Sequence, residues 1–290
     1  MCVIPGIGLW ALEWYNCGRF EDEECKSMNV FVFDIETIPD VEGGRKLYDL
    51  NGVSDEEVGT ILFHKRRQET GSSEFLRHHL HRVVAISAVL RTPDRLNVWS
   101  LGTEDSTEAE LIQRFFDGIE RYSPTIVSWN GSGFDLPVLH YRAMVNGVTA
   151  PRYWDMGEED RDYKWNNYIS RYHWRHTDLM DVLAGFQPRA AVPLDQMASL
   201  IGFPGKMGMD GSKVWDSWLA GDVKGIRDYC ETDVLNTYLV YLRFQMMRGH
   251  ISKSAYDQEI GLVRETLAAE DQPHFTEFLS NWPEPAEITD

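Results

Sequence analysis

The stretch "FVFDIETIPD", residues 31–40, decides the fold. With the two residues before it, this stretch is rich in Val, Phe and Ile, and Pro39 ends the apolar run. This pattern is typical of a buried β-strand. It also contains two carboxylates, Asp34 and Glu36, with one residue between them. Because side chains two apart on a strand point to the same face, Asp34 and Glu36 are expected side by side, with Ile35 facing the opposite side.

Two adjacent carboxylates repel each other, and partial burial raises the pKa of a carboxyl group. A bound divalent cation reverses this situation and makes the pair a set of ligands. The alternative is a strand end that reaches solvent. An isolated Asp-x-Glu does not decide between these two interpretations.

Further strands and helices alternate along the chain on both sides of this segment. Apolar runs bounded by turn residues predict strands at 82–90, 95–102, 125–131 and 174–179. Amphipathic patterns with capping residues predict helices at 54–69, 106–122, 135–147, 193–203 and 221–247. The turn "RTPD" joins the first two of these strands into a hairpin. The alternation predicts an α/β fold, and the hairpin makes its sheet mixed.

A second candidate segment is "WNGSGFDLPVL", residues 129–139. A strand ends at Trp129, and Asp135 stands where a helix begins, with Pro137 in its first turn. Helix capping alone explains this pattern, since Asp is a favoured N-cap and Pro is common just inside a helix. A loop that follows a parallel strand is also where α/β folds place functional groups. Both interpretations stay open on this segment alone.

A third candidate segment is "RDYCETDVLNTYLVYLRF", residues 227–244. Tyr229 and Asp233 are four apart and share one helix face. A neighbouring stripe that includes Cys230 suits the core, so Asp233 lies at the border of the buried face. An unpaired carboxylate there is costly, and a metal ion is one suitable partner. The alternative is an ordinary amphipathic helix with a solvated Asp.

Taken in order, "FDIET", "WNGSGFD" and "YCETD" resemble the three exonuclease motifs of the DEDD superfamily, in its tyrosine-bearing (DEDDy) branch. "HTDLMDVL", "LIGFPGKMGMDGSKVW" and "DYCETDVLNTYLVYLRFQMMRG" extend the likeness to stand-alone 3′–5′ exonucleases related to the proofreading domain of family B DNA polymerases. The resemblance covers roughly residues 29–265, with no departure at the five expected catalytic positions. It implies a ribonuclease H-like fold, in which a mixed central sheet of about five strands is flanked by helices.

The resemblance also implies the site. Asp34, Glu36, Asp135 and Asp233 are expected to converge on two divalent cations, Mg²⁺ or Mn²⁺, which prefer oxygen ligands. By this resemblance, Asp34 is expected to bridge both ions, Glu36 and Asp233 to complete the site that activates water, and Asp135 to hold the second ion largely through its water shell. Tyr229 is expected to orient the attacking water. The implied reaction is hydrolysis of the terminal phosphodiester at a 3′ end, which releases nucleoside 5′-monophosphates.

Three further features are candidates for substrate binding, each with an alternative. Lys206 stands among glycines that allow close backbone approach, so it either contacts a phosphate or belongs to a plain surface loop. Asn130 either contacts the terminal nucleotide or only shapes the turn before Asp135. Residues 161–176, "RDYKWNNYISRYHWRH", combine aromatic and basic side chains, which suits a surface that binds phosphates and bases. The same pattern suits core aromatics with polar spacing.

The charge of the chain limits the substrate. The chain has 28 Lys and Arg and 46 Asp and Glu, which gives a formal net charge of −18. A groove that binds long nucleic acid usually carries the opposite, positive charge. Two divalent ions supply positive charge at the scissile phosphate. We therefore expect weak binding of long duplexes and a preference for short or single-stranded 3′ ends, single-stranded DNA above all, or a protein partner that supplies the grip.

Other functions remain as alternatives. No residue identifies a contact to a 2′-hydroxyl, so a 3′–5′ exoribonuclease that trims small RNAs is one of them. A non-catalytic module that binds 3′ ends is expected to lack a carboxylate, and none is missing. A metal-dependent phosphatase or nucleotidase with the same carboxylates is distinguished by its activity on mononucleotides.

The organisation of the 290-residue chain follows from these assignments. We expect residues 1–27 to be a non-native or flexible N-terminal extension, because Met28 directly precedes the first strand. Residues 28–265 form the exonuclease domain, and residues 266–290 form a C-terminal helix and a tail that frays from Trp282. No apolar run approaches the roughly 18–20 residues that cross a bilayer, so no membrane is expected as a partner. The four Cys contain no Cys-x-x-Cys pair, which favours a reducing, cytoplasmic setting.

Overall fold

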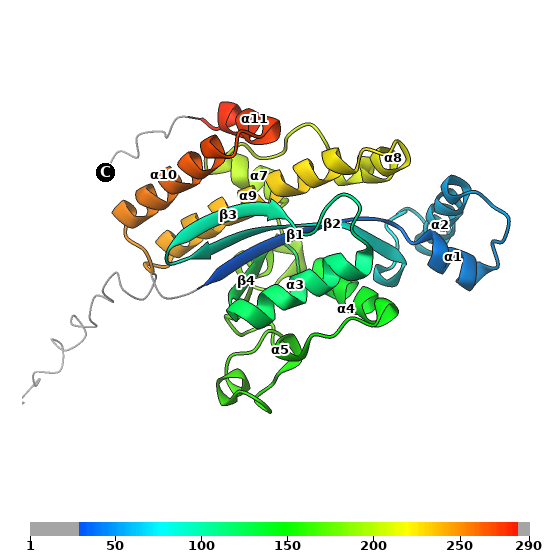
Figure 1. Ribbon diagram of the computed structural model, residues 1–290, viewed down its shortest axis with the longest axis horizontal. Helices are drawn as coiled ribbons and strands as arrows, with labels where there is room; N and C mark the ends of the chain where they lie inside the picture. Colours follow the sequence, from blue (N-terminus) through cyan, green and yellow to red (C-terminus); the bar gives the residue numbers. More distant parts are fainter. Residues whose placement is uncertain (1–28, 284–290) are drawn as a thin grey trace, which may run out of the picture.

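A computed structural model describes residues 29–283. Its centre is a five-stranded sheet in the order β3-β2-β1-β4-β5 (Figure 1). The strands are β1 (Val30–Pro39), β2 (His81–Thr92), β3 (Arg95–Ser100), β4 (Thr125–Ser128) and β5 (His176–Asp178). β1 pairs antiparallel with β2 and parallel with β4, β2 and β3 form the antiparallel hairpin, and β4 and β5 are parallel. The mixed α/β sheet predicted from the sequence is confirmed.

Helices cover both faces of this sheet. They are α1 (Val41–Tyr48), α2 (Asp55–Thr70), α3 (Glu108–Tyr122), α4 (Asp135–Asn146), α5 (Pro151–Trp154), α6 (Leu179–Leu183), α7 (Leu194–Leu200), α8 (Val214–Leu219), α9 (Val223–Met247), α10 (Lys253–Ala269) and α11 (Pro273–Asn281). Short 3₁₀ turns are η1 (His78–Leu80), η2 (Arg161–Lys164), η3 (Pro188–Ala190) and η4 (Gly211–Lys213). None of the helices in residues 29–283 has both the length and the apolar character that crossing a bilayer requires.

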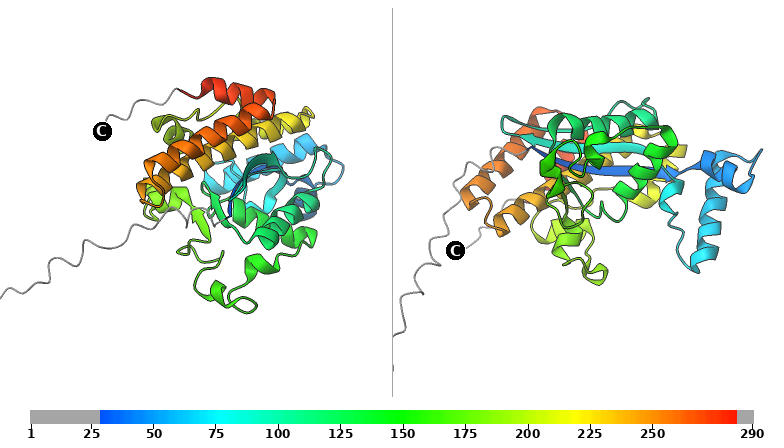
Figure 2. Two further views of the ribbon diagram at one scale, coloured as in Figure 1. Left: turned by 60° about the vertical axis from the view of Figure 1, so that its left-hand side comes forward. Right: turned by 90° about the horizontal axis from the view of Figure 1, so that it is seen from below.

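Alternate side chains of β1 belong to two different hydrophobic cores, one on each face of the sheet. Phe31, Phe33 and Ile35 pack with residues of α3 and α4 on one face. Val30 and Val32 pack with residues of α9 to α11 on the other face. Figure 1 and Figure 2 show these two helical layers with the sheet between them. Asp34 and Glu36 continue the row of Val30 and Val32, so they face the layer that contains α9.

Residues 40–80, which we call the arm, project from the end of the sheet where β1 ends (Figure 1). The sequence predicted one helix in this segment, at 54–69; the segment contains both α1 and α2, which pack on each other. The arm has a small core of Val41, Val58, Leu62, Leu76 and Leu80. Ser54 and Glu57 form the capping box predicted at the start of α2. A local hydrophobic core thus makes the arm a folded unit.

The C-terminal helices belong to the same core as α9. α10 runs through residue 265, where we placed a domain boundary, and Leu267 is buried. Trp282 is only 6% exposed and its ring lies 5.7 Å from that of Phe203. The expectation that the chain frays from Trp282 is therefore wrong at that residue, because its indole fills this core. The predicted extension at 1–27 and the last seven residues lie outside the described residues.

Candidate active site

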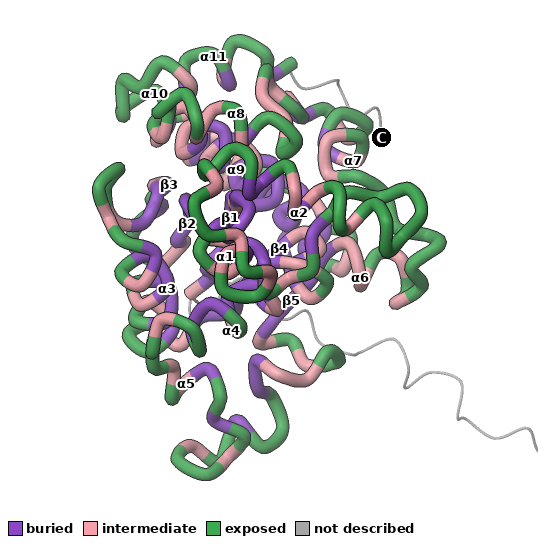
Figure 3. The backbone as a smooth tube through the Cα atoms, turned by 90° about the vertical axis from the view of Figure 1, so that its right-hand side faces the viewer, coloured by how far each residue is buried: buried purple, intermediate pink, exposed green. Residues whose placement is uncertain are grey.

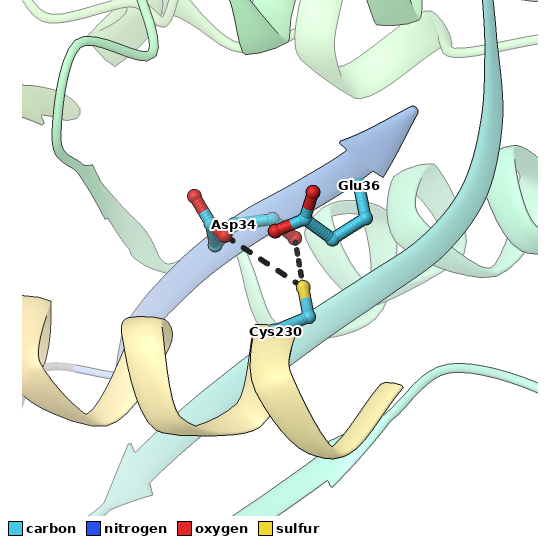
Figure 4. A group of neighbouring side chains, drawn as sticks. All are labelled: Asp34, Glu36 and Cys230. Atoms are coloured by element: carbon cyan, nitrogen blue, oxygen red, sulfur yellow. Dashed lines mark hydrogen bonds between the residues drawn. The ribbon is translucent and has the colours of Figure 1, made fainter. Parts of the chain in front are cut away.

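The polar face of β1 meets α9 at Asp34 and Glu36. Carboxylate oxygens of these two residues and the Sγ of Cys230 all lie within 4.8 Å of one another (Figure 4). The Cys230 thiol donates to the backbone oxygen of Asp34 at 3.5 Å and to its Oδ2 at 3.7 Å. The predicted placement of Asp34 and Glu36 on one face is confirmed. Cys230, which the sequence analysis assigned to the core, is buried and contacts the site as well.

Tyr229 and Asp233 come from the same stretch of α9. The Tyr229 hydroxyl donates a hydrogen bond to the Asp233 carboxylate. Burial raises the pKa of Asp233 to about 6, while the hydrogen bond from Tyr229 and the charge of Lys206 lower it. Burial, together with the charges of Asp233 and Glu36, raises the pKa of Tyr229. The phenol therefore stays protonated and acts as a hydrogen-bond donor.

Asp135 reaches the same place from the other side of the sheet. It is the first residue of α4, and the N-cap position belongs to Phe134, so capping does not explain Asp135. β4 pairs with β1 only over Val30–Val32, which leaves the backbone of β1 open beyond that point. Burial raises the pKa of Asp135 to about 7, although its carboxylate accepts hydrogen bonds from its own N–H and from that of Ile35. Asp135 thus docks onto β1 directly beside Asp34.

The loop before Asp135 is held by Asp178, at the end of β5. The Asp178 carboxylate accepts hydrogen bonds from the N–H of Asn130 at 2.9 Å and of Ser132 at 2.8 Å. Asn130 has a φ of 65°, and its carbonyl accepts from the N–H of Gly133 and Phe134. The backbone of Asn130 therefore shapes the turn before Asp135, which was one of its two interpretations from the sequence. Sequence reasoning missed Asp178; its only signal was a carboxylate at the end of a strand next to β4.

The four carboxylates repel one another. Burial raises the pKa of Asp34 well above its usual range, and the charges of Asp135, Glu36 and Asp233 raise it further. Burial likewise raises the pKa of Glu36, with Asp233 and Asp135 adding to the effect. Within residues 29–283, no Lys, Arg or His forms an ion pair with any of the four. Such a cluster costs free energy unless a cation joins it.

The donor atoms fit hard divalent cations. Four carboxylates offer only oxygen ligands, which Mg²⁺ and Mn²⁺ prefer. Burial and the neighbouring charge of Asp34 raise the pKa of Cys230. Its sulfur is therefore a protonated hydrogen-bond donor to Asp34 and not a thiolate ligand.

Lys206 faces this cluster from the loop between α7 and α8. It is exposed, and its charge lowers the pKa of both Glu36 and Asp233. The loop is fixed to α9 by Asn236, whose side chain accepts from the N–H of Gly205 at 3.1 Å and donates to its carbonyl at 2.8 Å. The structure thus brings Lys206 to the site, with Asn236 as an anchor that sequence reasoning did not find.

Residues 161–176 lie elsewhere. Tyr163 and Tyr168 are core residues, while Trp165 and Tyr172 are 77% and 71% exposed, so each interpretation holds for part of the segment. The Tyr168 hydroxyl donates to the carbonyl of Pro124, just before β4 begins. Tyr168 and the residues near it therefore lie where β4 starts, whereas Asp135 and the carboxylates lie beyond the ends of these strands. Arg171 reaches further along and pairs with Asp181 of α6, which follows the end of β5.

A comparison with known protein families gives a match. A family model described as "Predicted 3'-5' exonuclease related to the exonuclease domain of PolB" matches residues 73–282. The chain belongs to this family of predicted 3′–5′ exonucleases. The match includes Asp135, Tyr229 and Asp233, while Asp34 and Glu36 lie before it.

Solved structures give a more distant likeness. The family B DNA polymerase from the hyperthermophilic archaeon Pyrobaculum calidifontis is 19% identical, with a TM-score of 0.46. The likeness covers 76% of this chain and 24% of the polymerase chain, so the chain spans about a quarter of the length of that polymerase. A search of curated proteins gives no match.

Proposed function

We propose that this protein is a metal-dependent 3′–5′ exonuclease that hydrolyses terminal phosphodiester bonds, with single-stranded DNA as the favoured substrate, and releases nucleoside 5′-monophosphates. One observation supports this best. Asp34 and Glu36 lie close together on β1, and the charges of Asp135 and Asp233 raise the pKa of both, in a member of a family of predicted exonucleases.

The four carboxylates would hold two divalent cations, Mg²⁺ or Mn²⁺. Such a pair of ions stabilises charge on the attacking and leaving oxygens during in-line displacement at phosphorus. Asp34 would hold the ions together with the other three carboxylates, whose charges all raise its pKa. Cys230 holds the Asp34 carboxylate in place through its hydrogen bond.

Two other side chains act on the reactants directly. The Tyr229 hydroxyl, which points at Asp233, would position the attacking water by hydrogen bonding. Because its pKa is raised, it does not serve as the base. Lys206 is exposed and faces Glu36 and Asp233, so it would bind a phosphate oxygen near the scissile bond.

A nuclease assay tests this proposal. Purified protein is incubated with matched 5′-labelled single-stranded DNA and RNA oligonucleotides in Mg²⁺, Mn²⁺ or EDTA, with Asp34→Ala as the control. We expect a metal-dependent ladder that shortens from the 3′ end, with DNA cut faster than RNA and no ladder from Asp34→Ala. Undiminished activity in a clean Asp34→Ala preparation would refute the assignment.

The same assay separates the alternatives. Faster cleavage of RNA would identify an exoribonuclease, and release of phosphate from mononucleotides would identify a phosphatase or nucleotidase. Metal binding without any cleavage would indicate a non-catalytic module that binds 3′ ends. The cytoplasmic setting stays a prediction.

A further inference from the structure

One segment of this acidic protein, which runs from α2 of the arm to the start of β2, carries a net positive charge. Residues 64–82, which we call the basic strip, contain five Lys and Arg against two Glu, whereas the whole chain has a net charge of −18. The cations are Lys65, Arg66, Arg67, Arg77 and Arg82, and the strip also contains His64, His78, His79 and His81. A cationic segment on a strongly acidic chain is the natural contact for a polyanion.

The C-terminal part of the strip touches the candidate active site. The His78 Nε2 lies 2.9 Å from the carbonyl oxygen of Gly133, two residues before Asp135. The ring of Phe75 lies 5.3 Å from that of Phe134, which directly precedes Asp135. On β1, the Thr37 hydroxyl next to Glu36 bonds His81 at 2.9 Å. This part of the arm therefore lies beside the loop and the strand that carry Asp135 and Glu36.

The charged groups of the strip are available to a ligand. Arg67 and Arg77 are 56% and 59% exposed, and their partners Glu74 and Glu69 are exposed as well. Exposed ion pairs of this kind contribute little to stability and exchange readily for phosphate. The Lys65 Nζ lies over the ring of Tyr48 and lines a shallow hollow together with Arg66 and Arg77. In Figure 3, which faces the end of the molecule with the arm, much of the arm is exposed chain.

The strip also presents an aromatic ring. Phe75 is 56% exposed, and its ring packs beside His81 and Phe134. An exposed ring in a basic segment suits single-stranded nucleic acid, since unpaired bases stack on aromatic side chains while phosphates contact cations. A duplex offers no unpaired base to this ring. The occupant that fits is a single strand.

We propose that the basic strip binds the single-stranded segment upstream of the 3′ end, with Phe75 stacking on a base and Lys65, Arg67 and Arg77 contacting phosphates. This inference rests on the proposed exonuclease function, because it assumes that a 3′ end enters the carboxylate site. The basic strip would let the acidic chain bind its substrate without the protein partner that its net charge suggested.

A pair of matched triple variants tests the strip. Lys65→Gln, Arg67→Gln and Arg77→Gln are combined in one protein, and Arg121→Gln, Arg161→Gln and Lys164→Gln in another. The second set removes exposed cations near the start of β4, two of them in the segment where the sequence suggested a grip. Circular dichroism confirms that both proteins are folded.

Binding is measured by fluorescence anisotropy of a labelled 20-nucleotide single-stranded DNA in EDTA, where cleavage does not interfere. We expect the strip variant to bind about tenfold more weakly or worse, and the slope of log affinity against log salt to fall by about 2, since each lost phosphate contact removes about 0.7. The control triple should bind like the wild type. Equal affinity of the strip variant, or a greater loss in the control, would overturn the proposal.

Turnover of 5′-labelled oligonucleotides distinguishes failure of the strip proposal from failure of the exonuclease proposal. With 20-nucleotide DNA and metal present, the strip variant should show a KM raised about tenfold and a nearly unchanged kcat. If the wild type cleaves nothing, the exonuclease proposal fails, and the anisotropy result alone decides whether the strip binds single strands.

Two substitutions at one position test the stacking contact. Phe75→Leu keeps apolar bulk but loses the aromatic face, and should weaken binding about fivefold or more. Phe75→Trp should restore wild-type affinity. If both variants bind equally well, Phe75 only packs against its neighbours and does not stack on a base.

Discussion

At the scale of single residues, the hydroxyl of Tyr229 has a different role from the carboxylates beside it. Its hydroxyl donates to Asp233, and its raised pKa keeps the proton in place. A group in this state orients a water molecule without taking its proton. The carboxylates, in contrast, would hold cations, which a hydroxyl cannot replace.

Tyr229→Phe should therefore reduce turnover without abolishing it. We expect kcat to fall about 10- to 100-fold, the usual effect of one lost hydrogen bond to a charged or reacting group, with little change in KM. Single-turnover cleavage of a 5′-labelled oligonucleotide measures this, with Asp233→Asn as the comparison that removes a ligand. Activity as low as that of Asp34→Ala would show that Tyr229 does more than position water.

The residues of the site differ in how far they are predictable. Asp34 and Glu36 follow from the two-residue period of a strand, and Tyr229 and Asp233 from the spacing of a helix face. Asp178 does not, because its role depends on which backbone N–H groups the β4–α4 loop brings to the end of β5. Tertiary placement decides such contacts, and local sequence patterns do not encode it.

At the scale of elements, the arm is joined to the body through one buried ion cluster. Arg142 on α4 donates to Glu108 through Nε at 2.8 Å and through Nη2 at 2.6 Å, and its Nη1 pairs with Asp40. Asp40 is the N-cap of α1, and Glu108 also accepts from the N–H of Val83. One guanidinium thus links the start of the arm to α3 and α4.

Removing this guanidinium should destabilise the fold. Arg142→Met leaves two carboxylates buried without their partner, which typically costs about 3–5 kcal/mol. Urea unfolding measures the change in the free energy of unfolding. Arg114→Met, which removes an exposed Arg of α3, should change it by less than about 0.5 kcal/mol. Equal effects of the two substitutions would contradict the role of the cluster.

The elements themselves were largely predictable, and the packing within the arm was not. Strand and helix positions follow from apolar periodicity and capping residues such as Ser54 and Glu57. The arm's core combines residues from α1, α2 and the chain before β2, so no short window reveals it. Trp282 was misjudged for the same reason, since its partner Phe203 lies far away in the sequence.

At the scale of the whole molecule, the carboxylates of the candidate site destabilise the fold when no metal is bound. The pKa of Asp34 is raised in the folded chain, so folding favours its protonated form. Above the ordinary pKa of an Asp, the charged carboxylate therefore destabilises the metal-free protein. As the pH falls toward 4, the group takes up a proton and this destabilisation disappears.

Asp34→Asn should consequently be more stable than the wild type when metal is absent. Removing one charge from the cluster relieves about 1–3 kcal/mol at pH 8, and Tm should rise by about 3–8 °C in EDTA. The gain should shrink as the pH approaches 4. Mn²⁺ at about 1,000 times the Kd should reverse the order, since it stabilises the wild type by about 4.1 kcal/mol while the variant has lost a ligand.

Thermal unfolding of both proteins in EDTA and in Mn²⁺ checks this crossover, with Asp105→Asn as the matched control. Asp105 is exposed, so its substitution should leave Tm nearly unchanged under both conditions. If Asp34→Asn is less stable than the wild type in EDTA, the carboxylate contributes a stabilising contact that outweighs the repulsion. If Mn²⁺ raises both Tm values equally, the cation binds elsewhere on this acidic protein and not at Asp34.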